Sequence, residues 1–233
     1  MAEVIAARTL NVLYIFLDIG FLALLFGILI WAKRYTAAIF GILGGLLYFL
    51  VDYGGFYLLL NTRTVAGADP FWFLLWMSMS YGFTNFVWIW LWLDRDGHAL
   101  EWSILIVAGW FTTALLSQNF GGAFGTISIA RGTGSYHGLM AAILFVGYAI
   151  LCLYNIRMKD KGKRIDIPWI LAIGILVQFG WEFVLLITGI RPQGILPLVV
   201  NSLLETNLGL PYIYFIHRAV SKRRNEDLSR AAA

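Results

Sequence analysis

The sequence contains few of the residues on which soluble enzymes depend. Only 13% of its 233 residues are charged, whereas a soluble domain carries about 25%. The single cysteine, Cys152, excludes an internal disulfide bond and a metal site built from several cysteines. The three histidines, His98, His137 and His217, do not have the spacing of metal ligands. We therefore expect neither a metal nor another cofactor.

Apolar residues dominate the composition instead. They make up 60% of the chain, and the mean hydropathy is +0.77. Such values are typical of an integral membrane protein, for which membrane lipids are expected partners. The net charge of +4 does not indicate a nucleic-acid partner, because the basic residues lie between and after the apolar runs. The sequence does not specify an oligomeric state.

Seven apolar segments are long enough to cross a bilayer as helices, which takes about 20 residues. Charges, glycines and prolines separate them. The segments are 10–32, 36–60, 71–93, 102–119, 136–156, 167–189 and 195–217. The sequence therefore predicts an all-α, polytopic membrane protein with seven transmembrane helices, forming a single domain over residues 1–233.

The distribution of lysine and arginine predicts the orientation. With a cytoplasmic C-terminus, 13 of the 17 basic residues lie on the inner side, as the positive-inside rule requires. We therefore expect an outer N-terminus and an inner C-terminus, with a basic cytoplasmic tail over 218–233. The glycine-rich outer loop 119–135 is either a mobile lid or a plain connector.

The two ends of the chain resemble each other. Residues 50–60 align with 176–186, which places Asp52 opposite Gln178, and a weaker match places Asn85 opposite Asn207. This pattern predicts a 3+1+3 arrangement. Repeat one covers 10–93, a linker helix covers 102–119, and repeat two covers 136–217. A ligand site is then expected between the repeats.

The most unusual stretch is Gln178-Phe179-Gly180-Trp181-Glu182-Phe183, inside the sixth apolar segment. An ionisable side chain there costs about 3 kcal/mol on insertion scales, so a functional role is the leading interpretation. Gln178 and Glu182 are four residues apart and share a helix face. The alternative is a structural glutamate that is hydrogen-bonded between helices.

Other polar residues inside the segments must also face the protein interior, because lipid cannot satisfy them. We expect one polar chamber lined by Asp52, Asn85, Gln178, Glu182, Asn201, Glu205 and Asn207. No lysine or arginine lies within the segments to pair with these acids. Either some carboxyls are protonated, or a cation, a proton or a substrate supplies the missing charge. The deep tryptophans Trp76, Trp88 and Trp181 either line the chamber, where they favour a cationic species, or simply pack.

Residues 154–184 resemble a known family. Tyr154-Asn155-Ile156-Arg157 and Lys159-Asp160 lead into the segment that carries Trp181-Glu182-Phe183. This arrangement is similar to the small seven-span membrane terpene cyclases of fungal meroterpenoid and indole-diterpene pathways. In that family the Trp-Glu-Phe triplet lies in the second span, so the resemblance implies exchanged halves. It further implies that Glu182 protonates an epoxide or alkene to start a cation cascade, with Glu205 where the family has Asp.

Two functions follow from these residues. The first is an integral membrane cyclase or isomerase of a lipophilic, prenyl-type substrate, with Glu182 as the general acid and Asp52 or Glu205 assisting. Asn85, Gln178, Asn201, Asn207, Trp76, Trp88 and Trp181 would then bind the substrate. The alternative is a 3+1+3 small-solute or proton-coupled transporter with an acidic midplane site. A retinal protein is a third and weaker interpretation, because the last segment has no lysine for a Schiff base.

Overall fold

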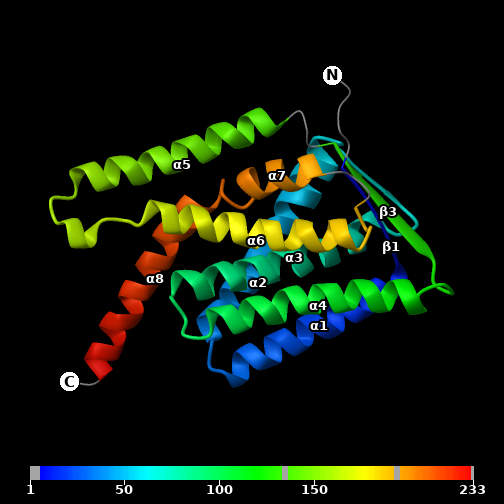
Figure 1. Cartoon of the computed structure of the whole chain (residues 1–233), viewed down its shortest axis with the longest axis horizontal. Coiled ribbons are helices and arrows are strands. Elements are labelled where there is room, and N and C mark those ends of the chain that lie inside the picture. Colours follow the sequence, from blue (N-terminus) through cyan, green and yellow to red (C-terminus); the bar gives the residue numbers. More distant parts are fainter. Residues whose placement is uncertain (1–5, 133–135, 192–194, 232–233) are drawn as a thin grey trace.

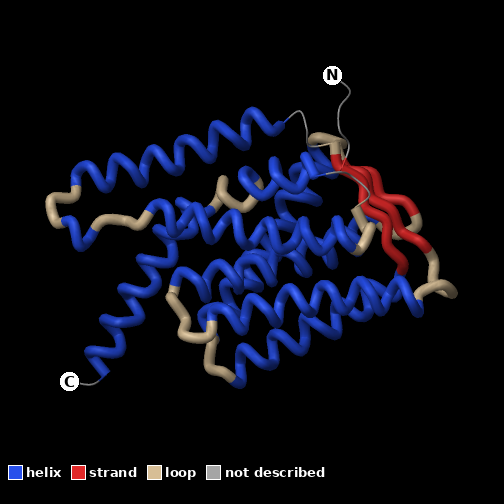
Figure 2. Tube along the Cα trace, viewed as in Figure 1, coloured by secondary structure: helices blue, strands red, loops and turns tan. Residues whose placement is uncertain are grey.

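A computed structural model describes residues 6–132, 136–191 and 195–231. Helices run roughly along one axis, and a small sheet covers one end of the bundle (Figures 1 and 2). The helices are α1 (Val12–Trp31), α2 (Tyr35–Phe49), α3 (Pro70–Leu93), α4 (Ala99–Phe120), α5 (His137–Arg157), α6 (Ile167–Ile187), α7 (Ile195–Leu204) and α8 (Leu210–Ala231). A π-helical segment, η1 (Leu50–Leu59), extends α2, and a 3-10 turn, η3 (Lys161–Lys163), precedes α6.

Five helical stretches of the described chain are long and apolar enough to cross a membrane, not seven. They are Val12–Trp31, Tyr35–Leu59, Ala99–Phe120, His137–Arg157 and Lys161–Ile187. The segment predicted at 71–93 forms α3, which is long but contains five tryptophans, two serines, a threonine and an asparagine. The segment predicted at 195–217 is interrupted after Leu204 and resumes at Leu210. The predicted tail 218–233 is not separate either, because α8 continues through it to Ala231.

Helix α3 occupies the centre of the molecule, where nearly all of its second half is buried. It packs closely against α2 because small residues face each other there. A Cβ atom on Gly82 would lie 2.7 Å from the Cα atom of Gly45, and one on Gly44 would lie 2.2 Å from the Cγ atom of Phe86. Glycine therefore allows the two backbones to approach, as at other helix contacts within membranes.

This contact predicts that Gly82→Ala destabilises the protein. The added methyl group meets the backbone of Gly45, which cannot move aside as a flexible side chain can, and overpacking of this kind costs about 1–3 kcal/mol. Gly20→Ala is the matched control, because a Cβ atom there meets nothing within 4 Å. Thermal unfolding in detergent should show a lower Tm for Gly82→Ala and no loss for Gly20→Ala. Equal Tm values for the two variants would contradict the close contact.

The predominantly helical structure agrees with the all-α prediction, and a small three-stranded sheet adds to the helices. The strands of this sheet are β1 (Ala6–Asn11), β2 (Arg63–Ala66) and β3 (Thr126–Arg131), and β3 lies between the other two, antiparallel to both. Loop 119–135 therefore contains the central strand and is neither a lid nor a plain connector. The burial of side chains alternates along β3, because Ile127 and Ile129 are buried whereas Thr126 is exposed. This period of two is typical of a half-buried strand and explains why the segment forms one.

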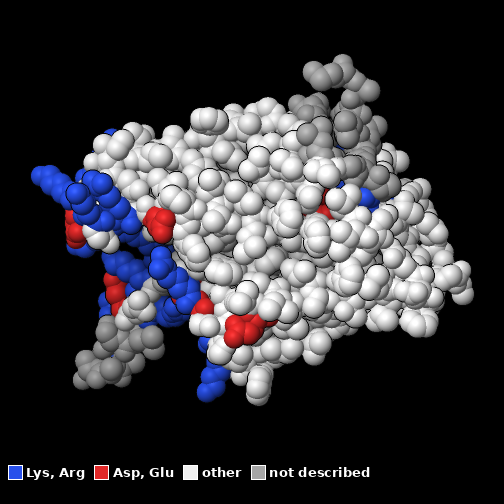
Figure 3. All heavy atoms as spheres, in the orientation of Figure 1, with Lys and Arg blue, Asp and Glu red and all other residues white. Residues whose placement is uncertain are grey.

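The charged side chains gather at the opposite end of the bundle. Figure 3 shows lysine and arginine over the connection between α5 and α6 and over α8, while the rest of this face is almost free of charge. Large apolar side chains such as Phe16, Phe145 and Ile156 are exposed along the helices, which fits a surface that faces lipid. We call the two ends the basic end and the sheet end.

At the basic end, Asp94 holds α8 against α3. Its Oδ1 atom lies 2.7 Å from Nε2 of His217 and 3.6 Å from Nη2 of Arg224, and Trp90 Nε1 donates to its Oδ2 atom at 3.0 Å. Burial alone would raise the pKa of Asp94, but the hydrogen bond and charge of His217 and the charge of Arg224 outweigh it and lower the pKa. The ionised carboxylate is thus the form that docks α8.

This contact predicts a pH-dependent attachment of α8. Because the folded-state pKa of Asp94 is lowered, its stabilisation is complete above the unfolded value of about 3.9 and is lost as the pH falls through the folded value. Hydrogen exchange of α8 at pH 7 should be faster in Asp94→Asn than in the unmodified chain. The difference should shrink on acidification below about pH 4. A difference that is constant with pH would show that Asp94 does not act through its charge.

Candidate functional site

The predicted chamber residues lie on four elements that meet toward the sheet end. Asp52 lies on η1, Asn85 on α3, Gln178 and Glu182 on α6, and Asn201 on α7, while Glu205 and Asn207 lie in the turn between α7 and α8. All of these residues are buried except Glu205, which is half-buried. Most of them form two bonded groups, one around Asp52 and one around Gln178 and Glu182. Together with Arg8 and the partners of these acids, Arg63, Arg131 and Arg191, we call the two groups the polar core.

Gln178 is the hydrogen-bonding centre of the α6–α7 part of the polar core. Its Nε2 atom donates to Glu205 Oε2 at 2.9 Å and to Glu182 Oε1 at 3.3 Å, and its Oε1 atom accepts from Thr206 Oγ1 at 2.7 Å. Asn201 Nδ2 also donates to Glu182 Oε1 at 3.3 Å. The expectation that Gln178 and Glu182 share a helix face is therefore confirmed, and α7 is held to α6 by side chains rather than by apolar packing alone.

The expectation that the acids lack basic partners is wrong. Arg63 Nη2 lies 2.8 Å from Asp52 Oδ1, Arg131 Nη2 lies 3.5 Å from the same oxygen, and Arg191 Nη1 contacts Glu182 Oε2. None of these arginines belongs to a predicted apolar segment, so the residues of the segments alone do not indicate basic partners for the acids. They come from the ends of β2 and β3 and from the chain after α6, and they fold back onto the helices.

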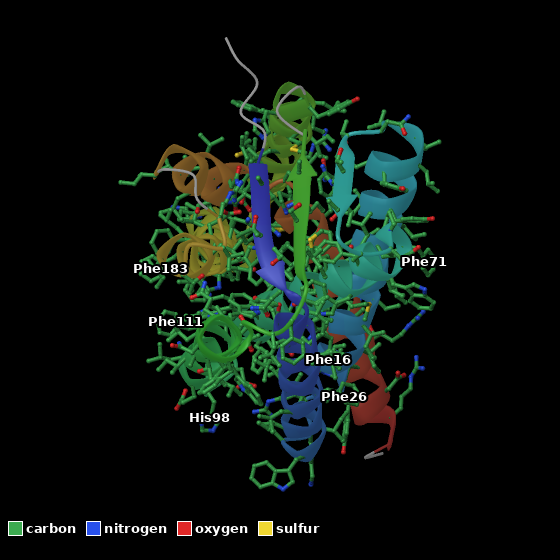
Figure 4. The ribbon with its side chains drawn as sticks, turned by 90° about the vertical axis from the view of Figure 1, so that its right-hand side faces the viewer. Phe16, Phe26, Phe71, His98, Phe111 and Phe183 are labelled. Atoms are coloured by element: carbon green, nitrogen blue, oxygen red, sulfur yellow. The ribbon has the colours of Figure 1, made fainter. Side chains whose placement is uncertain are left out.

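The sheet register explains how three arginines reach one face. Arg63 is directly opposite Arg131, and Arg8 is opposite Ile129. Opposite residues in antiparallel strands project to the same side, as do residues two apart along a strand. Arg8, Arg63 and Arg131 therefore share the side of the buried Ile127 and Ile129, which faces the helices. Looking onto the sheet end, Figure 4 shows β1 and β3 crossing in front of the bundle, with Phe111 and Phe183 at its rim.

Arg8 differs from the other three arginines because it contacts no carboxylate of the described chain. Its Nη1 atom approaches only the sulfur of Met77, at 4.0 Å, and its Cζ atom lies 5.7 Å from the ring centroid of Trp181. The side chain is nevertheless buried, with 4% of the residue exposed. A fixed positive charge is thus held inside the protein beside an aromatic ring.

The pKa values show that the arginines act on one another. Burial, followed by the charge of Arg131, lowers the pKa of Arg8 and of Arg63 to about 10. Burial, followed by the charge of Arg8, lowers the pKa of Arg191 to about 10. For Arg131 burial acts in the same direction, but the negative charge of Asp52 outweighs it and raises the pKa. All four therefore stay cationic at neutral pH.

Two tyrosines that sequence reasoning missed complete the polar core. The hydroxyl of Tyr81 donates to Asp52 Oδ2, and the ring of Tyr48 packs against that of Tyr81 in a tilted arrangement with centroids 4.8 Å apart. Both tyrosines are separated along the chain from the acid motif. The four arginines had a signal, because they are the basic residues that lie away from the basic end. Short alternating stretches such as Thr126–Arg131 mark strands that carry such residues inward.

The predicted aromatic residues separate into two places. Trp181 packs against Trp110 at 4.7 Å and against Tyr81 at 6.1 Å, and Trp88 follows at 6.0 Å from Trp110, so these rings form a wall beside the polar core. Trp76 lies elsewhere and donates from Nε1 to Asp18 of α1 at 3.0 Å.

Asn207 also lies outside the polar core. Its Oδ1 atom accepts a hydrogen bond from the Tyr148 hydroxyl of α5 at 2.9 Å. The side chain lies against Gly174 of α6, where a Cβ atom would come within 2.1 Å of Asn207 Oδ1. Asn207 therefore connects α5 to the turn between α7 and α8 rather than lining the predicted chamber.

Comparison of the chain with protein-family models, with curated proteins and with solved structures finds no match. The geometry of the polar core is therefore the basis for the functional argument.

Proposed function

We propose that the chain is a membrane transporter that binds a small solute in the polar core. The observation that carries this proposal is the interruption of the last predicted span. Helix α7 ends at Leu204 and α8 begins at Leu210, and Glu205 and Thr206 in the turn between them both bond Gln178. Irregular backbone at membrane depth is tolerated only inside protein or beside a water-filled cavity, and interrupted helices form the binding sites of many transporters.

The order of charged residues supports a 3+1+3 design. Arg8 precedes the first helix of repeat one and Arg131 precedes the first helix of repeat two. Each second helix then carries an acid that pairs with an arginine after the helix ends, Asp52 with Arg63 and Glu182 with Arg191. In this proposal each half contributes one ion pair, with the two acids one helical turn apart in the aligned repeats, and the solute binds between the halves.

The proposed topology has seven crossings, an outer N-terminus and an inner C-terminus. Helix α3 crosses within a ring of the other helices, so its polar residues do not meet lipid. Helices α7 and α8 together make the seventh crossing. The proposal places the sheet end outside and the basic end inside, where arginine and lysine contact anionic lipid headgroups.

Solute uptake into proteoliposomes tests the proposal. A panel of labelled organic acids, amino acids and inorganic anions should include one that accumulates, and Glu182→Gln should abolish its uptake because the Arg191 and Asn201 contacts depend on the carboxylate. Glu101→Gln is the matched control, since Glu101 lies exposed at the start of α4. Absence of uptake across the panel, with an intact fold, would reject transport.

A terpene cyclase is the second candidate, and one observation favours it. Glu205 is the acid of the polar core that forms no ion pair within the described residues, and the wall of Trp181, Trp110 and Trp88 is of the kind that stabilises cations. Protonation of an epoxide or alkene needs a neutral carboxylic acid. Glu205 suits that role better than Glu182, which already contacts Arg191.

Membranes that contain the protein test this second candidate. They should convert a prenylated epoxide into a cyclic isomer of the same mass, separable by chromatography before mass spectrometry. Glu205→Gln should block the conversion, whereas Glu101→Gln should not. Unchanged substrate across a broad panel of such epoxides would reject it.

A further inference from the structure

Arg8 is a buried cation whose partner is missing from the described chain. Its residue is 4% exposed, its Nη1 atom reaches only Met77 Sδ at 4.0 Å, and its Nε atom has no hydrogen-bond partner among the residues described. An unpaired buried charge is strongly destabilising. An anion bound beside Arg8 would supply the missing negative charge and would therefore stabilise the folded protein.

The surroundings of Arg8 are positive overall. Arg131 is the diagonal neighbour of Arg8 across the β1–β3 pairing, and Arg191 follows Ile190, whose carbonyl oxygen accepts from the Thr9 N–H at 3.1 Å. Two further guanidinium groups therefore lie near Arg8, and both repel it electrostatically. Together with Arg63, four arginines face three carboxylates, those of Asp52, Glu182 and Glu205. Asp18 is not counted among these carboxylates, because it lies on α1, accepts from Trp76 and contacts none of the four arginines within the described residues.

The arginines also retain hydrogen-bond donors that no described residue uses. These are the Nε atoms of Arg8, Arg63, Arg131 and Arg191, and the Nη1 atom of Arg63. Buried donors are nearly always satisfied in folded proteins, by protein, water or ligand. Water would satisfy the donors but would leave the excess positive charge uncompensated, whereas an anion would satisfy both.

We propose that the arginine cluster around Arg8 is a binding site for an oxyanion, a phosphate or carboxylate group. A guanidinium presents a planar fork of donors that matches the oxygens of such a group, and three neighbouring forks can bind it from several sides. The Trp181 ring, 5.7 Å from Arg8 Cζ, fixes the guanidinium from one face. The anion is either a free small solute or the headgroup of a lipid.

This inference deepens the proposed function, because it gives the transported solute an anionic group, but binding itself does not require transport. The full chain in neutral detergent is titrated with inorganic phosphate, with acetate, and with a short-chain phosphatidic acid, at constant ionic strength set by chloride. A binding anion should raise the Tm progressively, by on the order of 5 °C at a hundredfold excess over its Kd. A response to phosphate or acetate identifies a free solute, and a response to phosphatidic acid alone identifies a lipid.

Two variants separate a ligand site from a structural ion network. Arg8→Gln should abolish the anion-dependent rise in Tm and leave the Tm without ligand unchanged or higher, because an unpaired charge has been removed. Arg157→Gln, at an exposed position of the basic end, should keep the full response. The proposal is overturned if none of the three anions shifts the Tm, or if Arg8→Gln retains the response. An intact Tm shift without uptake into proteoliposomes would reject transport and leave the anion site standing.

Discussion

Arg191→Gln should lower the Tm by about 10 °C, the largest effect we expect from a single substitution. Arg191 and Glu182 form an ion pair in which both side chains are almost fully buried, at 6% and 1% exposure. Removing one partner of a buried pair leaves an uncompensated charge and costs about 3–5 kcal/mol, and each kcal/mol shifts the Tm by about 2–4 °C in a chain of this size. Circular dichroism or dye-based unfolding in detergent measures the change.

A double-mutant cycle distinguishes the ion pair from general damage to α6. Glu182→Gln alone should also destabilise, since Arg191 is then left without its carboxylate. The double variant should recover much of the loss because no unpaired charge remains. Arg157→Gln serves as the control for charge removal at an exposed site. If the two single effects simply add in the double variant, the residues do not stabilise the protein as a pair.

Asp52→Asn should cause a loss of similar size, about 3–5 kcal/mol, for a different reason. One carboxylate there faces two guanidinium groups, Arg63 at 2.8 Å and Arg131 at 3.5 Å, and it also accepts from the Tyr81 hydroxyl. Its loss therefore leaves two like charges close together. Because both arginines end strands of the sheet, the amides of β2 and β3 should exchange hydrogen faster in this variant.

Because two arginines face Asp52, removing one of them should restore only part of the stability that Asp52→Asn loses. Asp52→Asn combined with Arg63→Gln should recover only part of the stability, because Arg131 still lacks its partner. Adding Arg131→Gln should recover more. Hydrogen exchange of α5 serves as the internal control, since this helix lies outside the polar core. Full recovery in the double variant would mean that the 3.5 Å contact of Arg131 contributes nothing.

The sequence was sufficient to predict the helices, because membrane spans depend on long apolar runs that are visible in one dimension. It was not sufficient to predict the interruption at Glu205. The run around Glu205 and Pro211 is apolar enough to suggest one helix, and only the hydrogen bonds of Glu205 and Thr206 with Gln178 show why the backbone turns there. The predicted meeting of Gln178 and Glu182 holds because helical spacing fixes which residues share a face. Asn201 joins them from α7 through a contact between helices, which spacing alone does not predict.

The partners of the acids depended on contacts that no local pattern reveals. Arg8 and Arg131 are separated by more than a hundred residues and become neighbours only through the pairing of β1 with β3. Arginines in segments that are assigned as loops, as Arg131 is, are expected to be exposed to solvent. The strands are four to six residues long, long enough to show alternation, but the sequence alone does not show which strands pair.

The order of the sheet also determines which movements remain open to the molecule. Strand β3 leads into the second half of the chain, and it pairs on both edges with strands that flank the first half. The two halves are thereby fastened together at one extremity by a ladder of backbone hydrogen bonds. They cannot separate there as rigid blocks without breaking that ladder. The proposed transporter would therefore have to open toward that side by a smaller movement, such as displacement of the short helix α7, while the three strands stay paired.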